Sequence, residues 1–253
     1  MKNVFKLGIF ALVLATGLTS CDNEDPIGSK TTFYPLIDVI GDGLLFAPQD
    51  ETFTDPGATA TIDEAEVPVT TTYVGRYQGE TYTGNLDTSV PDLYTANYTA
   101  INADGFPGTA TRQVFVGKTG DLVNSIEGLY TSTVFRNGAQ GAPASAYTDI
   151  EYIIIWQNED GSYQISDSFG GWYLFARAIA DSETPGARII ANDISTNSFT
   201  FPGTQSNAYF GGSAKITGLT VNAADRSLDL VTVWQADAAT TYTFTVHLEQ
   251  VQL

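Results

Sequence analysis

The stretch Tyr94-Thr95-Ala96-Asn97-Tyr98-Thr99-Ala100 alternates Tyr and Ala with Thr and Asn, and the turn sequence Asn102-Ala103-Asp104-Gly105 follows almost directly. An alternation of period two places one set of side chains on a buried face of a strand and the other set on a wet face. Residues 109–116 resume the strand after the turn, which is the pattern of a β-hairpin. The hairpin predicts an antiparallel β fold for this part of the chain.

Short strand patterns continue outward from this hairpin over residues 33–117. Turn sequences separate them, with Asp55-Pro56-Gly57 and Pro91-Asp92 as clear breaks. This length and pattern suit an Ig-like β-sandwich of about seven strands, although the segment contains no Cys pair. We therefore expect residues 33–117 to form one domain.

A family resemblance rests on a series of motifs that follow one another in this segment. They are Asp55-Pro56-Gly57-Ala58-Thr59-Ala60, Asp87-Thr88-Ser89-Val90-Pro91, the alternating stretch 94–100, the turn 102–105 and Thr109-Ala110-Thr111-Arg112. The series resembles the Ig-like domain repeated in surface lipoproteins of Bacteroidetes. The resemblance implies a spacer or presentation module. Asp92 departs from the pattern, which usually has Gly there, so the type of this turn is left open.

The remaining residues, 118–253, also read as β structure. Residues 118–127 are expected to link the domains through one helical turn, with Leu122, Val123 and Ile126 on one face. Eight or nine strands follow, the clearest being Leu129–Arg136, Ile150–Gln157, Ser162–Asp167, Ala187–Asn192, Ser198–Phe201, Ala214–Val221, Ser227–Trp234 and Thr240–Val251. Because no long amphipathic helix is visible, an all-β antiparallel barrel or sandwich is expected.

A second resemblance covers this part of the chain. Ile126-Glu127-Gly128-Leu129-Tyr130, Arg136-Asn137-Gly138, residues 163–167 and Gly170-Gly171-Trp172-Tyr173 are similar to the C-terminal β domain that accompanies such Ig-like modules in Bacteroidetes lipoproteins. The resemblance implies fold and location and leaves function open.

The N-terminus has the pattern of a lipoprotein leader. Residues 1–6 carry two Lys, residues 7–18 are largely apolar, and the only Cys of the chain is Cys21. We expect residues 1–20 to be a signal peptide, Cys21 to carry the lipid, and residues 21–32 to form a flexible tether. Asp22-Asn23-Glu24-Asp25 resembles the acidic export signal of Bacteroidetes lipoproteins. The resemblance implies an outer-membrane location at the cell surface.

Composition excludes several classes of function. The 253 residues include 29 acidic and 11 basic side chains, for a net charge of −18, which argues against nucleic acid as a partner. One His and one Cys argue against most metal sites, and no cofactor is expected. His247 is expected to be an exposed strand residue rather than a member of a catalytic triad. The acidic loops 63–66 and 102–105 lack the spacing of a calcium-binding EF-hand loop.

Aromatic residues in glycine-rich loops are the best candidates for binding. Phe169, Trp172 and Tyr173 surround a Gly pair, and Tyr209 precedes a second pair. Exposed Tyr or Trp rings offer an apolar face with a polar edge, on which sugar rings stack. The alternative is that these rings close one end of the barrel as core residues.

Three functions therefore compete. The preferred one is a non-catalytic surface module that binds a glycan or another extracellular ligand on an Ig-like spacer. The second is a structural or adhesive subunit that contacts another envelope protein. The third is a hydrolase that uses carboxylates such as Glu151 and Asp167, and we rank it last.

Overall fold

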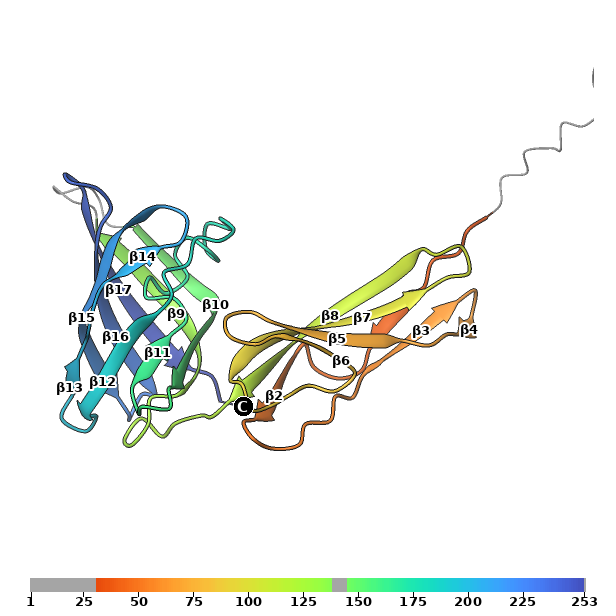
Figure 1. Cartoon of the computed structure of the whole chain (residues 1–253), viewed down its shortest axis with the longest axis horizontal. Helices are drawn as coiled ribbons and strands as arrows, with labels where there is room; N and C mark the ends of the chain where they lie inside the picture. The colour runs from red at the N-terminus through yellow and green to blue at the C-terminus, as the bar shows by residue number, and fades with distance from the viewer. Residues whose placement is uncertain (1–30, 138–144, 253) are drawn as a thin grey trace, which may run out of the picture.

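The computed structural model describes residues 31–137 and 145–252, and the regular elements in these ranges are all β-strands. The expected signal peptide, Cys21 and most of the expected tether lie outside the described residues. Two β domains lie end to end (Figure 1). The fold is all-β, as the sequence predicted.

The N-terminal domain is a sandwich of two sheets. The smaller sheet has the order β1-β3-β4 and the larger β2-β8-β7-β5-β6, with β2 and β8 parallel. The bounds are β1 Leu36–Val39, β2 Leu44–Pro48, β3 Ala58–Ile62, β4 Ala65–Glu66, β5 Thr70–Gly75, β6 Thr81–Thr83, β7 Asp92–Ile101 and β8 Pro107–Gly117. The described domain has eight strands where about seven were expected, and two of them, β4 and β6, are too short to show any periodicity in the sequence.

The hairpin that motivated the prediction is confirmed. Tyr94, Ala96, Tyr98 and Ala100 on β7 are all buried, and β7 pairs with β8 in continuous register from Asp92↔Val116 to Ile101↔Pro107. In the turn, the Asn102 side-chain oxygen accepts the backbone N–H groups of Asp104 and Phe106. The local sequence therefore determines this hairpin.

A buried ion pair joins the two sheets. Arg112 on β8 lies 2.9 Å from the Asp55 carboxylate, and neither side chain is more than 9% exposed. Tyr73 and Tyr98 donate their hydroxyls to the same carboxylate at 2.8 and 2.6 Å. Arg112 also donates to the backbone carbonyls of Ile40 and Gly57. The Asp55-Pro56-Gly57 motif is thus the polar centre of the sandwich as well as a turn.

The C-terminal domain is one curled antiparallel sheet of nine strands, in the order β13-β12-β11-β10-β9-β17-β16-β15-β14. The bounds are β9 Gly128–Asn137, β10 Ser145–Gln157, β11 Tyr163–Ile165, β12 Ala187–Asp193, β13 Ser198–Thr200, β14 Gln205–Asn207, β15 Gly211–Asn222, β16 Ser227–Gln235 and β17 Thr241–Gln250. The turn sequence Glu159-Asp160-Gly161 connects β10 to β11.

Connectivity forces this sheet to curl. The edge strands β13 and β14 are separated by residues 201–204, and five Cα–Cα steps span at most about 19 Å. The two edges of the sheet must therefore approach each other, as Figure 1 shows. Asn197 bridges the gap, because its side chain accepts the N–H of Val221 on β15 at 2.6 Å and donates to the carbonyl of the same residue.

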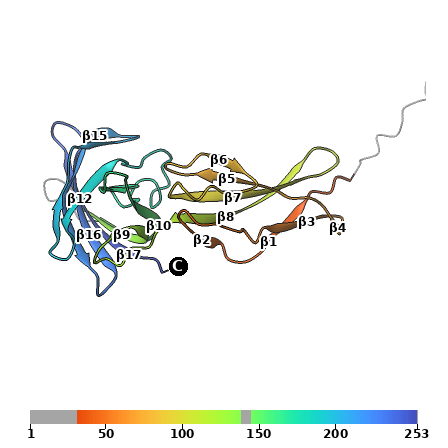
Figure 2. The ribbon, with the colours of Figure 1, turned by 60° about the horizontal axis from the view of Figure 1, so that its bottom comes forward.

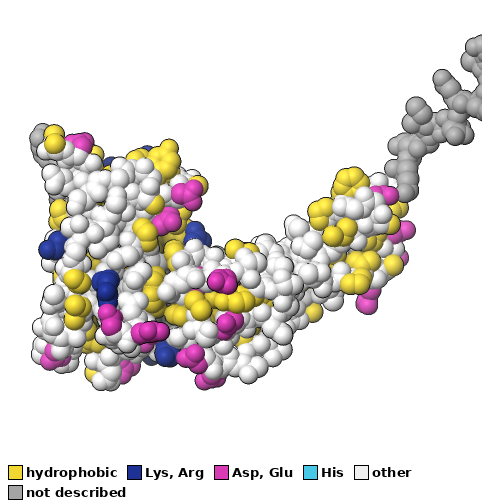
Figure 3. Space-filling model, viewed as in Figure 1, with side chains coloured by type: hydrophobic (Ala, Val, Ile, Leu, Met, Phe, Trp, Pro, Cys, Tyr) yellow, Lys and Arg dark blue, Asp and Glu magenta, His cyan; other side chains and the backbone are white. Residues whose placement is uncertain are grey.

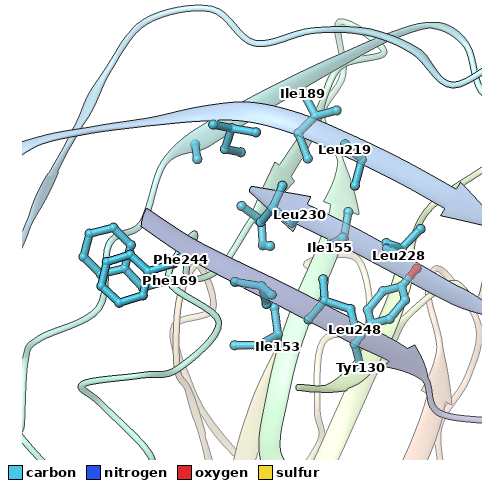
Figure 4. Close-up of a cluster of buried hydrophobic side chains, with 14 of the residues drawn as sticks. Tyr130, Ile153, Ile155, Phe169, Ile189, Leu219, Leu228, Leu230, Phe244 and Leu248 are labelled. Carbon is cyan, nitrogen blue, oxygen red and sulfur yellow. The ribbon is translucent and has the colours of Figure 1, made fainter. Parts of the chain in front are cut away.

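Apolar side chains fill the interior of the curled sheet. Phe244, Val246 and Leu248 on β17 are fully buried, in keeping with the alternation of apolar and polar residues along this strand. Leu228 and Leu230 on the neighbouring strand β16 and Ile153 and Ile155 on β10 belong to the same buried cluster (Figure 4).

The segment 118–127 contains no helical turn, so that expectation is wrong. The Asp121 carboxylate accepts the N–H groups of Val123, Asn124 and Ser125, and Leu122 has φ +58°. Leu122 and Ile126 are buried, whereas Val123 is 51% exposed. The side-chain turn of Asp121 competes with a helix and wins because it satisfies three backbone donors at once.

A third apolar cluster lies between the domains. Leu93 and Phe115 of the Ig-like domain pack in one cluster with Leu129, Ile154 and Trp156 of the curled sheet. The ends of β7 and β8 lie beside β10 in Figure 2. Tyr77, in the loop after β5, stacks on Trp156 with ring centroids 6.5 Å apart. The two domains therefore share a buried interface.

Asp92 fixes the loop that carries Tyr77. Its buried carboxylate accepts the backbone N–H groups of Tyr77, Gln78 and Gly79 at 2.7–3.0 Å. Asp92 is the first residue of β7, so it is a strand residue rather than part of a turn. The departure from the family pattern thus supplies an anchor for the loop at the domain junction.

The buried ion pair yields a stability prediction. Arg112→Ala leaves the Asp55 carboxylate buried without its cation, so the free energy of unfolding should fall by about 3–5 kcal/mol in urea denaturation. Arg188→Ala is the matched control, because Arg188 pairs with Asp160 at the surface and should cost at most about 1 kcal/mol. Equal losses for the two variants would contradict the role assigned to Arg112.

Candidate ligand-binding surface

The loop between β11 and β12, residues 166–186, is organised by one buried carboxylate. Asp167 has no exposed surface and accepts the N–H groups of Phe169, Gly171 and Thr184 at 2.9–3.1 Å. Burial raises the pKa of Asp167 to about 6, although these three donors oppose the shift. Asp167 therefore holds the start, middle and end of the loop together.

The three rings of this loop are core residues. Phe169 stacks on Phe244 with centroids 4.2 Å apart (Figure 4), and Phe169, Trp172 and Tyr173 are at most 4% exposed. As placed, these three rings have no face to offer a ligand, and the core alternative describes them. A Trp172→Ala change should therefore cost about 3–5 kcal/mol of stability rather than remove a surface contact.

The glycines between these rings serve close packing rather than flexibility. Gly170 and Gly171 both have positive φ. A Cβ on Gly170 would lie 2.4 Å from Val246, and one on Gly171 would lie 2.6 Å from the Phe175 ring. The backbone thus passes too close to its neighbours for any residue larger than Gly. The loop therefore packs tightly over the interior of the sheet.

Tyr209 is the predicted ring that reaches solvent. It is 64% exposed, and the adjacent Phe210 is 42% exposed. The two rings meet edge to face at 4.8 Å, and Phe210 lies 4.8 Å from the buried ring of Tyr173. We call Tyr209 and Phe210 the aromatic ridge.

The backbone beneath the aromatic ridge is fixed by hydrogen bonds. The Asn207 side-chain oxygen accepts the N–H groups of Tyr209 and Phe210, while its amide donates to the carbonyl of Ser182. Trp234 Nε1 donates to the carbonyl of Gly211 at 3.0 Å. The ridge is therefore a pre-formed surface. Phe210 was not predicted as a site residue. The only indication in the sequence was its position next to Tyr209.

A hollow of about 460 Å³ lies beside the same loop, lined by Tyr147–Glu151 on β10 and Leu174–Ala176. A register shift between Tyr147 and Ile150 produces this wall of the hollow. Asp149 and Glu151 are exposed there, and Tyr147 packs against Trp172 at 4.5 Å. Arg76 of the Ig-like domain braces the opposite wall, with its guanidinium 4.4 Å from the Phe175 ring centroid. No sequence pattern indicated this hollow, because a bulge in β10 breaks the alternation of its residues.

The carboxylates considered for hydrolysis have different environments. Glu151 lines the hollow, whereas Asp167 is buried in the loop and does not line it. The hollow therefore does not bring together Glu151 and Asp167, the two acids that the sequence suggested for glycoside hydrolysis.

His247 lies on the outer face of β17, opposite Asp229, with its Nδ1 2.8 Å from that carboxylate. Across the described chain, no three His, Cys, Asp or Glu side chains come together in a way that suits a metal ion. Within residues 31–137 and 145–252, no helix is long and apolar enough to span a membrane.

The buried carboxylate predicts a pH effect. The pKa of Asp167 in the folded chain, about 6, lies above its ordinary value of 3.8, so the folded state retains this proton to higher pH than the unfolded state. The stability that Asp167 contributes is therefore greatest below about pH 4 and falls as pH rises to about 6, by about 3 kcal/mol for two pKa units.

Asp167→Asn cannot ionise and should lack this fall. Urea unfolding midpoints of both proteins at pH 4, 5, 6 and 7 measure it, because the titration of all other groups cancels in the difference. The same pH dependence in both proteins would contradict the assignment.

Comparisons with known proteins agree with this architecture. A family model described as a bacterial surface protein Ig-like domain matches residues 37–116, and one described as a C-terminal domain matches residues 119–250. The crystal structure of the lipoprotein BT2262 from Bacteroides thetaiotaomicron aligns with a TM-score of 0.61 and 24% identity over 86% of this chain and 100% of that chain, which shows a shared fold. No curated protein matches. The chain belongs to the family defined by this C-terminal domain, which follows a bacterial surface Ig-like domain here.

Proposed function

We propose that this protein is a non-catalytic binding module of the outer-membrane surface, anchored through a lipid on Cys21. In this proposal residues 1–20 are removed, the tether spans residues 21–32, and the Ig-like domain holds the curled sheet away from the bilayer. The ligand is a glycan or another extracellular molecule, and the aromatic ridge contacts it.

The observation that carries the proposal is the exposure of the aromatic ridge on a fixed support. Two adjacent exposed rings offer apolar surface, and the Tyr209 hydroxyl adds a polar edge. A sugar presents C–H faces and hydroxyl edges, so this combination suits stacking. Phe169, Trp172 and Tyr173 take part as the buried support, since Phe210 packs directly on Tyr173.

The hollow is connected to the ridge through the loop between β11 and β12. Tyr173 contacts the ridge, and the next three residues, Leu174–Ala176, line the hollow. Asp149 and Glu151 there offer carboxylate oxygens that accept hydrogen bonds from hydroxyl groups. A ligand of several sugar units would therefore meet stacking and hydrogen-bonding groups on one end of the domain.

A glycan array tests the proposal, followed by titration with the best glycan. Tyr209→Ala should weaken binding about tenfold, which corresponds to about 1.4 kcal/mol, without lowering the unfolding midpoint. Phe135→Ala is the matched control, because Phe135 is a similarly exposed ring on β9 and should leave affinity unchanged.

Two outcomes count against the proposal. Equal losses from both variants would exclude the ridge as the contact. No glycan binding, together with stable capture of another envelope protein, would favour the structural or adhesive subunit.

A further inference from the structure

Large apolar side chains gather at the end of the Ig-like domain that is farthest from the curled sheet. Figure 3 shows this patch beside the start of the described chain. Its members are Phe33, Tyr34, Leu36, Ile101 and Phe106, which are 45–74% exposed. We call this set the apolar tip.

The apolar tip is a fixed surface. The Asn102 amide donates to the carbonyl of Phe33 at 2.8 Å, and the Tyr34 and Phe106 rings lie 5.6 Å apart. A Cβ on Gly108 would lie 2.2 Å from the Pro35 carbonyl oxygen, so residues 33–36 run tightly against the β7–β8 hairpin. Soluble domains rarely keep a contiguous apolar patch of this kind without a partner.

The position of the tip along the chain indicates that partner. The described chain begins at Thr31, at the same end of the domain (Figure 1). Cys21 lies ten residues earlier in the sequence, and ten residues of extended chain span at most about 35 Å. If Cys21 carries a lipid, as the proposed function requires, the tip is the part of the described chain that is held next to the bilayer.

We infer that the apolar tip lies in the interfacial region of the bilayer that holds the lipid anchor. Aromatic and aliphatic side chains of interfacial proteins bury about 5–10 Å into the boundary between head groups and acyl chains. The lipid supplies the affinity, and the tip sets the orientation. The two domains then stand with the ligand-binding surface away from the membrane.

The contact is apolar rather than electrostatic. Residues 31–75 and 99–111 contain no Lys or Arg. The β3–β4 hairpin and the turn after β7 lie at the same end (Figure 1), and they contain Asp63, Glu64, Glu66 and Asp104. We therefore expect anionic lipid to weaken the contact.

Depth-dependent quenching tests the inference with the lipidated chain in phosphatidylcholine vesicles that contain brominated phosphatidylcholine. The three native Trp residues, Trp156, Trp172 and Trp234, all belong to the C-terminal domain, so Phe106→Trp adds a reporter at the tip. Bromolipid should reduce the added fluorescence about twofold or more. Ile190→Trp on β12 is the matched control, since Ile190 is similarly exposed, and its fluorescence should not change.

Equal quenching of the two reporters, or none in Phe106→Trp, would overturn the inference. Leu36→Glu combined with Phe106→Trp should reduce the quenching, whereas unchanged quenching would also count against it. Flotation of the vesicles tests the anchor separately. If Cys21→Ser no longer floats with the vesicles, the chain is anchored through a lipid on Cys21. If the anchored chain then shows no quenching of the tip reporter, the tip contact is refuted while the anchor stands. If the tip reporter is not quenched and photocrosslinking joins the tip to a protein, that protein rather than the bilayer covers the tip, and the inference is overturned.

Discussion

The contact of Tyr77 with Trp156 is the interaction on which the arrangement of the whole molecule depends. The Asp92 carboxylate holds three consecutive backbone N–H groups of the Tyr77 loop and thereby presents the ring to β10. Leu93, directly after Asp92, enters the same apolar cluster as Trp156. Because Trp156 and Ile154 are buried in a cluster that both domains share, separating the domains would expose apolar surface on each.

This junction connects the domain that carries the apolar tip to the domain that carries the aromatic ridge. Arg76 precedes Tyr77 and lies against Phe175, which lines the hollow. Phe175 in turn belongs to the loop that Asp167 organises and from which Tyr173 supports the aromatic ridge. The Ig-like domain therefore contributes to the hollow as well, since Arg76 from one of its loops packs against Phe175 in the wall.

The sequence predicted the features that depend on local pattern. The alternation of residues 94–100 predicted the correct buried face of β7, and the turn at Asn102-Ala103-Asp104-Gly105 lies where expected. Features that depend on residues far apart in the chain could not be predicted from the sequence. The bond between Asn197 and Val221 that closes the curled sheet is one, and the Asp92 loop is another. The glycines near Trp172 suggested a flexible binding loop, yet they are there because no Cβ fits, and the rings beside them are core.

The distance between the two domains tests the central claim most directly. Cys21 is the only Cys, so Cys21→Ser leaves a background in which Val74→Cys and Ile190→Cys, both at exposed positions, carry two spin labels. Double electron–electron resonance should give one narrow distance distribution, and Asp92→Ala should broaden it by releasing the Tyr77 loop. A broad distribution with Asp92 in place would contradict a rigid junction.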